Sequence, residues 1–304
     1  MSWRSLIKSL STVACGAGLF YAGRQYETGS LCLTRKAFAA SAPAAVVPSS
    51  SLVPNLTPSL GPSRVSQIMK YGFPGYDNLR TFEDFVLSYD RRTRTVHWVF
   101  EQLSPDRLVY DSSVDRSKCN FHEDASVHSF FRSQNSDYKG SGFDRGHMAA
   151  AGNHRRSQNA IEQTFLLSNM APQVGKGFNR DKWNDLEKYV RKLARKNLNV
   201  YVCTGPLYLP KYGPDGKLYV KYQVIGAHNV AVPSHFFKVL LIETAPNSFD
   251  LESYVLPNMA IDDATPLSAF LMPVDAVERA AGFLLFDKLP RDQLKKINGV
   301  PVKA

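Results

Sequence analysis

Residues 140–154 read Gly-Ser-Gly-Phe-Asp-Arg-Gly-His-Met-Ala-Ala-Ala-Gly-Asn-His, and they hold the strongest chemical motif in the chain. The glycines around Asp144, Arg145 and His147 let the backbone approach a ligand closely on a tight turn. Because the ordinary pKa of histidine is about 6.5, His147 is mostly neutral at pH 7 and can accept a proton from water. The planar guanidinium of Arg145 can bind two phosphate oxygens. The alternative is that Arg145 pairs with Asp144 and His147 is an ordinary loop histidine.

A second polar group begins 32 residues after His147. The apolar positions of residues 180–196 have the spacing of one helix face, with Asn179 near the centre of that stripe and Glu187 at its edge. Inward polar groups need partners, because burying one unpaired costs about 1–3 kcal/mol. A hydrated Mg²⁺ is a suitable partner, since it takes one or two oxygen ligands from protein. The alternative for Asn179 is a helix N-cap.

These two stretches, together with Leu-Ser-Asn-Met-Ala-Pro-Gln at residues 167–173, resemble the DNA/RNA non-specific endonucleases of the ββα-metal fold. The likeness continues through residues 201–208, 221–226 and 232–239 and spans roughly residues 63–286. It is closest to the mitochondrial member of the family. The resemblance implies an α+β fold in which helices flank a central, largely antiparallel sheet.

The resemblance also implies a role for each motif residue. His147 is the expected general base, Asn179 the only direct protein ligand of Mg²⁺ (or of a substituting Mn²⁺), and Glu187 the residue that orients the metal's waters. The same likeness gives a phosphate contact to Arg145, a loop-holding role to Asp144 and a position bordering the substrate to Asn169. From its place before the motif, Phe121 is a candidate contact for a base or sugar, and a small-core aromatic is the alternative.

The pattern of elements favours the same fold class. Residues 85–89 and 95–100 predict a hairpin, and residues 157–170 predict a short helix running into a strand at 164–167. Further strands are predicted at 199–204, 218–225, 236–243 and 249–256, with a turn at 214–216. Pro273 and Gly282 bracket a predicted helix at 273–281. Strands in runs, with helices inserted between them, indicate α+β with a largely antiparallel sheet.

Positive charge is concentrated around the motif. The chain carries 37 Lys and Arg against 27 Asp and Glu, a formal net charge of +10. Outside the first 50 residues the chain has 32 basic and 26 acidic residues. Residues 132–200 alone contain 13 basic and 6 acidic residues. The surplus therefore coincides with the candidate site, which favours a phosphate-backbone partner over a solvated basic helix.

The N-terminal region is typical of a mitochondrial presequence, since residues 1–50 hold five basic residues and a single acid, Glu27. Its short apolar stretch is also compatible with a signal-peptide core. We expect a presequence at 1–48, a Pro-rich linker at 49–62 and a nuclease domain at 63–304. The sequence has no run of 18 apolar residues, so it predicts no membrane-spanning helix. Four cysteines are too few for a disulfide framework, and Cys119 and Cys203 can pack as small apolar groups.

The expected function is therefore Mg²⁺-dependent hydrolysis of DNA and RNA phosphodiesters that leaves 5′-phosphate and 3′-hydroxyl ends. The family likeness further implies a homodimer of the mitochondrial intermembrane space that reaches the nucleus and degrades DNA during cell death. Two alternatives are an exonuclease-like mitochondrial relative and a nucleic-acid-binding protein that does not cut. A third, a zinc site, is suggested only faintly by the spacing of Cys119, His122 and His128.

Overall fold

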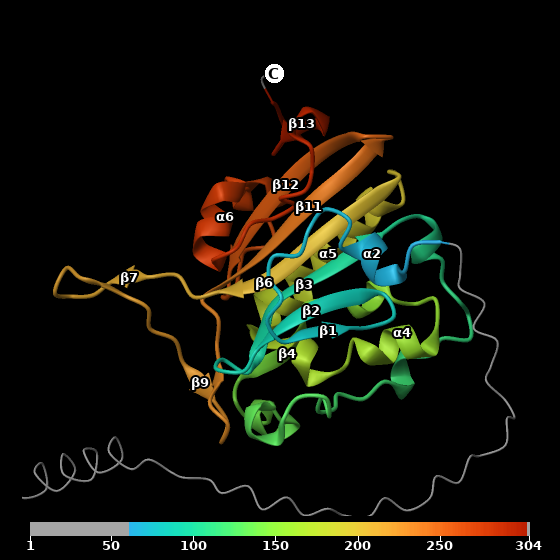
Figure 1. Ribbon diagram of the computed structural model, residues 1–304. Helices are drawn as coiled ribbons and strands as arrows, with labels where there is room; N and C mark the ends of the chain where they lie inside the picture. The colour runs from blue at the N-terminus through green and yellow to red at the C-terminus, as the bar shows by residue number, and fades with distance from the viewer. Residues whose placement is uncertain (1–60, 303–304) are drawn as a thin grey trace, which may run out of the picture. The chain divides into compact units, whose positions relative to one another are not determined.

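The computed structural model describes residues 61–302, in which eight strands form one sheet (Figure 1). In spatial order the strands are β1 (Leu79–Thr81), β2 (Phe85–Asp90), β3 (Thr95–Leu103), β6 (Asn199–Leu207), β11 (His235–Ala245), β12 (Ser248–Pro257), β13 (Leu294–Ile297) and β14 (Val300–Pro301). Every neighbouring pair is antiparallel except β12 and β13. The predicted α+β class with a largely antiparallel sheet is confirmed.

The two faces of the sheet carry separate cores because successive side chains of a strand point to opposite faces. On β11, Phe236, Leu240 and Ile242 join the core that also contains Trp183, Leu186 and Val190 of α5 (Trp183–Ala194). The alternate β11 residues Phe237, Val239 and Leu241 pack with α2 (Arg64–Ile68) and α6 (Val274–Ala281). Helix α5 therefore covers one face of the sheet, and α2 and α6 cover the other.

Besides short 3-10 helices and a π-helical segment at Gly175–Lys182, the described part of the chain contains several shorter helices and strands. They are α3 (Asn135–Tyr138), α4 (Gln158–Gln163) and three antiparallel strand pairs: β4 (Phe143–His147) with β5 (Met170–Val174), β7 (Lys211–Tyr212) with β8 (Leu218–Tyr219), and β9 (Val224–Ile225) with β10 (Val230–Ala231). The segment that carries β7 extends away from the sheet in Figure 1. No helix among residues 61–302 is long and apolar enough to cross a membrane.

Most predicted elements are present, and two need correction. The hairpin and the α5 helix are confirmed, as is α6, which follows Pro273 and ends at Gly282 with a φ of 81°. The predicted strand at 164–167 is wrong: this segment follows α4, and the strand begins at Met170. The predicted strand at 218–225 is wrong as a single element: it is broken into β8 and β9, and most of its apolar side chains are exposed. The expected presequence and most of the linker lie outside the described residues.

Candidate active site

The antiparallel pair of β4 and β5 presents the motif stretch at the edge of a pocket. Gly146 on β4 pairs with Ala171 on β5, and a Cβ at Gly146 would overlap the side chain of Gln173. Directly before β5, the buried amide of Asn169 accepts from the N–H of Ala149, two residues after β4, at 2.9 Å and donates to the Ala149 carbonyl at 3.0 Å. These contacts fix the backbone that follows His147.

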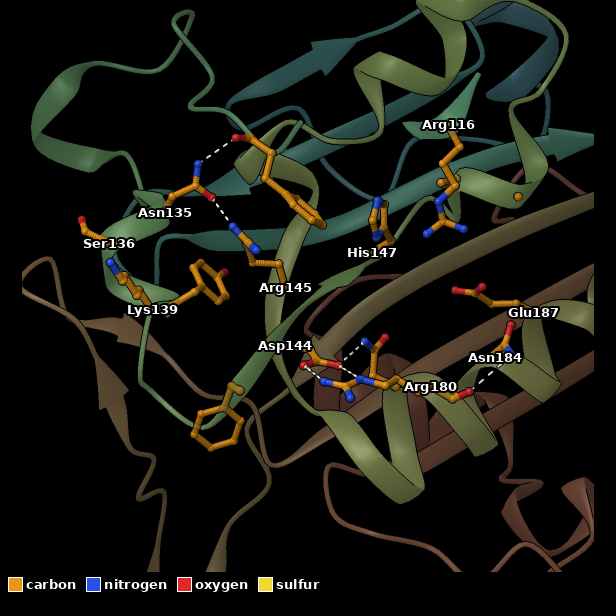
Figure 2. Close-up of a pocket in the computed structure, with 16 residues that line it drawn as sticks. Arg116, Asn135, Ser136, Lys139, Asp144, Arg145, His147, Arg180, Asn184 and Glu187 are labelled. Carbon is orange, nitrogen blue, oxygen red and sulfur yellow. Dashed lines mark hydrogen bonds and ion pairs between the residues drawn. The ribbon is translucent and has the colours of Figure 1, made fainter. Parts of the chain in front are cut away.

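One pocket of about 890 Å³ gathers most of the predicted site residues (Figure 2). The predicted residues that line it are Phe121, Asp144, Arg145, His147, Asn179 and Glu187. Asn169 does not line it, because its side chain is fully buried and bonded to backbone groups. The expected contact between Asn169 and substrate is therefore corrected: Asn169 supports the loop that carries His147.

His147 has an environment that favours its neutral form. Its ring lies 4.8 Å from that of Phe165 and 5.5 Å from that of Phe121. Desolvation by these walls, together with the positive charges of Arg116 and Arg145, lowers the pKa of His147 to about 3. Nε2 is buried without a hydrogen-bond partner in the described structure. A neutral imidazole keeps one unprotonated nitrogen, so this residue can take a proton from water.

Asn179 faces the pocket with its amide held in one orientation. Its Nδ2 donates to Asp144 Oδ2 at 3.0 Å, and because a carboxylate can only accept, the amide oxygen is the atom left for another ligand. Arg180 binds the same carboxylate through Nε at 2.8 Å and Nη2 at 2.6 Å. The hydrogen bond from Arg180 is the main reason that the pKa of Asp144 is lowered. Asn179 is thus not an N-cap, and Asp144 pairs with Arg180 and not with Arg145.

The local backbone explains how Asn179 reaches this position. After β5, Lys176 and Gly177 have non-helical backbone angles, and Gly177 has a φ of 83°. The chain then turns helically from Phe178 into α5, and the buried Phe178 packs against Trp183. Gly177 donates its N–H to Asp181 Oδ2 at 2.5 Å, which holds the bend closed. Asn179 therefore stands one residue after an anchored aromatic ring.

Glu187 enters the pocket from α5, two helical turns after Asn179. Desolvation raises the pKa of Glu187, and the positive charges of Lys238 and Arg191 oppose that rise. Its nearest cation is Arg191, whose Nη1 lies 3.9 Å from Oε2. The carboxylate and the oxygen of Asn179 are oxygen ligands of the kind that Mg²⁺ prefers. The side chains present therefore fit a metal with few protein ligands.

Arg145 and Phe121 form one wall of the pocket. The guanidinium lies 4.2 Å from the centre of the Phe121 ring and donates to Asn135 Oδ1 at 2.6 Å. Phe121 also contacts the rings of His147 and Phe165, so it belongs both to the pocket and to a small core. Figure 2 shows Arg145 on the same side of the pocket as Asn135. The guanidinium of Arg145 is thus held in one orientation in the same pocket as His147.

Sequence reasoning missed several pocket residues, among them Arg116, Asn135, Lys139 and Asn184. Arg116 begins a three-residue 3-10 helix, and Asn135 and Lys139 lie at the two ends of the single-turn helix α3, elements too short to show a periodic pattern. Asn184 had a usable signal, because Arg180, Asn184 and Glu187 follow the spacing of one helix face.

The faint zinc spacing is not supported in the described part of the chain, where no three His, Cys, Asp or Glu side chains are grouped to hold a metal. The Nδ1 of His122 lies 2.9 Å from the Asn120 carbonyl, and His128 caps a turn by accepting from the Phe130 N–H. Cys119 and Cys203 are both free thiols. Burial raises the pKa of each, which makes them less reactive than an exposed thiol.

Comparison with known proteins identifies the family of this chain. Residues 64–292 match the model of the DNA/RNA non-specific endonucleases. The chain is 60% identical over 241 residues to mitochondrial endonuclease G of Caenorhabditis elegans, covering 79% of this chain and 78% of that protein. It is 56% identical over 218 residues to mitochondrial endonuclease G of Homo sapiens, covering 72% of each.

A solved structure gives the same result in three dimensions. The crystal structure of the EndoG/EndoGI complex contains a chain with a TM-score of 0.78 to this one and 60% sequence identity. The match covers 80% of this chain and 99% of that chain, so the α+β nuclease fold is shared almost completely. On sequence, fold and site together, this nuclease belongs to the DNA/RNA non-specific endonuclease family.

Proposed function

We propose that this chain is a Mg²⁺-dependent endonuclease that hydrolyses phosphodiester bonds in both DNA and RNA. One observation carries the proposal: a neutral histidine, an asparagine oxygen and a glutamate line the same pocket beside three arginines. Few other reactions need a base, a metal site and cationic groups for phosphate in this combination. The family membership supports cutting over binding alone.

In the proposed mechanism, His147 removes a proton from a water molecule that attacks phosphorus in line with the 3′-oxygen. A new bond forms between the water oxygen and phosphorus, and the bond from phosphorus to the 3′-oxygen breaks. The leaving oxygen takes a proton from solvent, so the products carry 5′-phosphate and 3′-hydroxyl ends. Arg145 holds the phosphate through two N–H groups.

Asn179 would hold the metal through its amide oxygen, and Glu187 would accept hydrogen bonds from the waters around it. Mn²⁺ would substitute, because it shares a preference for oxygen ligands. When bound, the ion stabilises negative charge that develops on the phosphoryl and leaving oxygens. Asp144 keeps the amide of Asn179 in the required orientation. Phe121 would support a sugar or base from the pocket wall.

The biological setting is proposed from the relatives. Both are named mitochondrial, and the composition of residues 1–48 supports import. We place the protein in the intermembrane space as a homodimer that is released to the nucleus during cell death and fragments DNA there.

Closed circular DNA tests the proposal most directly. The full-length protein, His147→Ala and Asn179→Ala are incubated with this substrate in Mg²⁺ or in EDTA. We expect nicking and linearisation by the wild type in Mg²⁺ only, with a loss of at least about 100-fold in each variant. Binding without cutting by the wild type would support the non-cutting alternative. Degradation of linear but not circular DNA would support an exonuclease-like enzyme.

A further inference from the structure

Charged side chains lie inside the core directly beneath α5. Glu101 on β3 and Lys238 on β11 are 0% and 1% exposed, and both occupy strand positions that face the α5 side of the sheet. Burying an ion costs several kcal/mol unless partners compensate it. Lys238 Nζ donates to Thr204 Oγ1 at 2.6 Å and lies 4.9 Å from the centre of the Trp183 ring. Glu101 has different hydrogen-bond partners, and these partners lie between the core and the pocket.

Glu101 is held by the two residues that end the motif stretch. Its Oε1 accepts from Asn153 Nδ2 and from His154 Nε2, each at 2.9 Å. Burial alone would raise the pKa of Glu101, but the hydrogen bond and the charge of His154 lower it below its ordinary value. Glu101 is therefore a fixed carboxylate in the core.

Asn153 makes a second contact with its other amide atom. Its Oδ1 accepts from Arg191 Nη1 at 3.2 Å. A carboxylate only accepts and a guanidinium only donates, so the two partners fix the amide in one orientation. Neither Asp nor Leu could bridge an anion and a cation in this way. Asn153 is thus a specific connector between β3 and α5.

Arg191 carries the connection into the pocket. The same Nη1 atom lies 3.9 Å from Glu187 Oε2, one helical turn earlier. Space for the guanidinium depends on Gly152 in the pocket wall, because a Cβ there would lie 3.0 Å from Nη1 and 3.3 Å from Cζ. Hydrogen bonds therefore join Glu101 to Asn153 and Asn153 to Arg191, and an ion pair at 3.9 Å joins Arg191 to Glu187 in the pocket.

We infer that Asn153 is a positioning residue for the active site, because its amide joins the fixed Glu101 carboxylate to Arg191, and Arg191 sets the Glu187 carboxylate. The inference rests on the proposed function, in which Glu187 contacts the waters of the metal. A purely structural polar cluster would end within the core, whereas this one ends at a pocket side chain. Groups that orient the ligands of a metal site typically change affinity or activity 10- to 100-fold when removed.

The test compares Asn153→Ala with Asn159→Ala in the full-length protein. Asn159 is a matched control: its Nδ2 donates to the Glu83 carboxylate at 2.7 Å on the surface of α4, outside the pocket. For Asn153→Ala we expect kcat with Mg²⁺ to fall about 10-fold or more, KM for DNA to stay within about twofold, and Mn²⁺ binding, measured by electron paramagnetic resonance, to weaken. Asn159→Ala should match the wild type in kcat, in KM and in Mn²⁺ binding.

A double-mutant cycle with Glu187→Gln separates positioning from general destabilisation. If Asn153 acts through Glu187, Asn153→Ala should cause little further loss in the Glu187→Gln background. Losses that multiply, or unchanged kcat and Mn²⁺ binding in Asn153→Ala, would overturn the inference. Should Asn153→Ala fail to fold by circular dichroism, Arg191→Lys tests the same link, since a flexible ammonium does not reproduce the fixed, planar donor geometry of the guanidinium. Unchanged kcat in Arg191→Lys would then overturn it.

The wild-type protein distinguishes the two levels of failure. A wild type that does not cut with Mg²⁺ contradicts the proposed function itself. A wild type that cuts, alongside variants with normal kcat and metal binding, contradicts only the role of Asn153.

Discussion

At the scale of single residues, the property that matters most is the protonation state of His147. The unfolded chain titrates this imidazole near its ordinary pKa of about 6.5, whereas desolvation and the positive charges of Arg116, His154 and Arg145 lower the pKa to about 3 in the folded protein. Between these values the unfolded state binds a proton that the folded state does not. Stability must therefore decrease as the pH falls from about 6.5 toward 3.

We accordingly expect His147 to remain neutral at pH 5 in the metal-free protein. The measurement is an NMR titration of the imidazole signals, assigned by comparison with His147→Gln. In the same pH range, the free energy of unfolding should fall less steeply for His147→Gln than for the wild type. A titration midpoint close to 6.5 would show that the aromatic walls do not desolvate the ring.

At the scale of elements, periodic segments were predictable and irregular ones were not. Helix α5 could be predicted because Trp183, Leu186 and Val190 bury one face of it against the sheet. The strand at 218–225 could not be predicted correctly, because apolar residues such as Leu218 and Val220 suggest burial but project from the sheet. Sequence gives the type of a side chain and its spacing, whereas exposure depends on which other elements cover it.

The same distinction holds within the site. His147, Asn179 and Glu187 could be predicted because one short motif and one helix carry them. Arg116 comes from a three-residue 3-10 helix 31 residues before His147, and only the folding of the chain around the pocket brings the two together. The connection from Glu101 to Asn153 joins β3 to a loop, and no local pattern in either one encodes it.

The bend before α5 offers a prediction at this scale. Gly177 has a φ of 83°, and a Cβ would lie 2.8 Å from Ala260 Cβ and 2.9 Å from its Cα. Gly177→Ala should therefore suffer both left-handed strain, about 1–2 kcal/mol, and crowding that displaces Asn179. Gly216→Ala is the control, since Gly216 has a φ of 73° with nothing within 4 Å.

Urea unfolding and nuclease activity separate these two effects. Both variants should lose stability from strain, but Gly177→Ala should lose more, and it alone should lose activity. Equal stability losses with full activity in both would mean that the bend does not set the position of Asn179.

At the scale of the whole molecule, the distribution of charge determines how nucleic acid is held. Of the 13 basic residues in 132–200, the pocket is lined by Lys139, Arg145 and Arg180, and Arg116 joins them from outside this segment. The exposed cations of α5, such as Lys192, do not line it. Four cationic side chains line the pocket, so phosphate contacts should dominate.

Binding should therefore weaken steeply with salt and depend little on sequence. With the His147→Ala protein in EDTA, a plot of log affinity against log salt should be linear, with a slope of about −0.9 for each phosphate neutralised. Arg145→Met should make that slope shallower by about 0.9, the amount expected for one lost phosphate contact. Lys192→Met, outside the pocket, should leave the slope unchanged. An equal change in both variants would mean that the duplex extends across α5, and a strong preference among duplexes of different sequence would mean that bases are read directly. The pocket cations account for recognition by themselves only if the slope responds to Arg145 and not to Lys192.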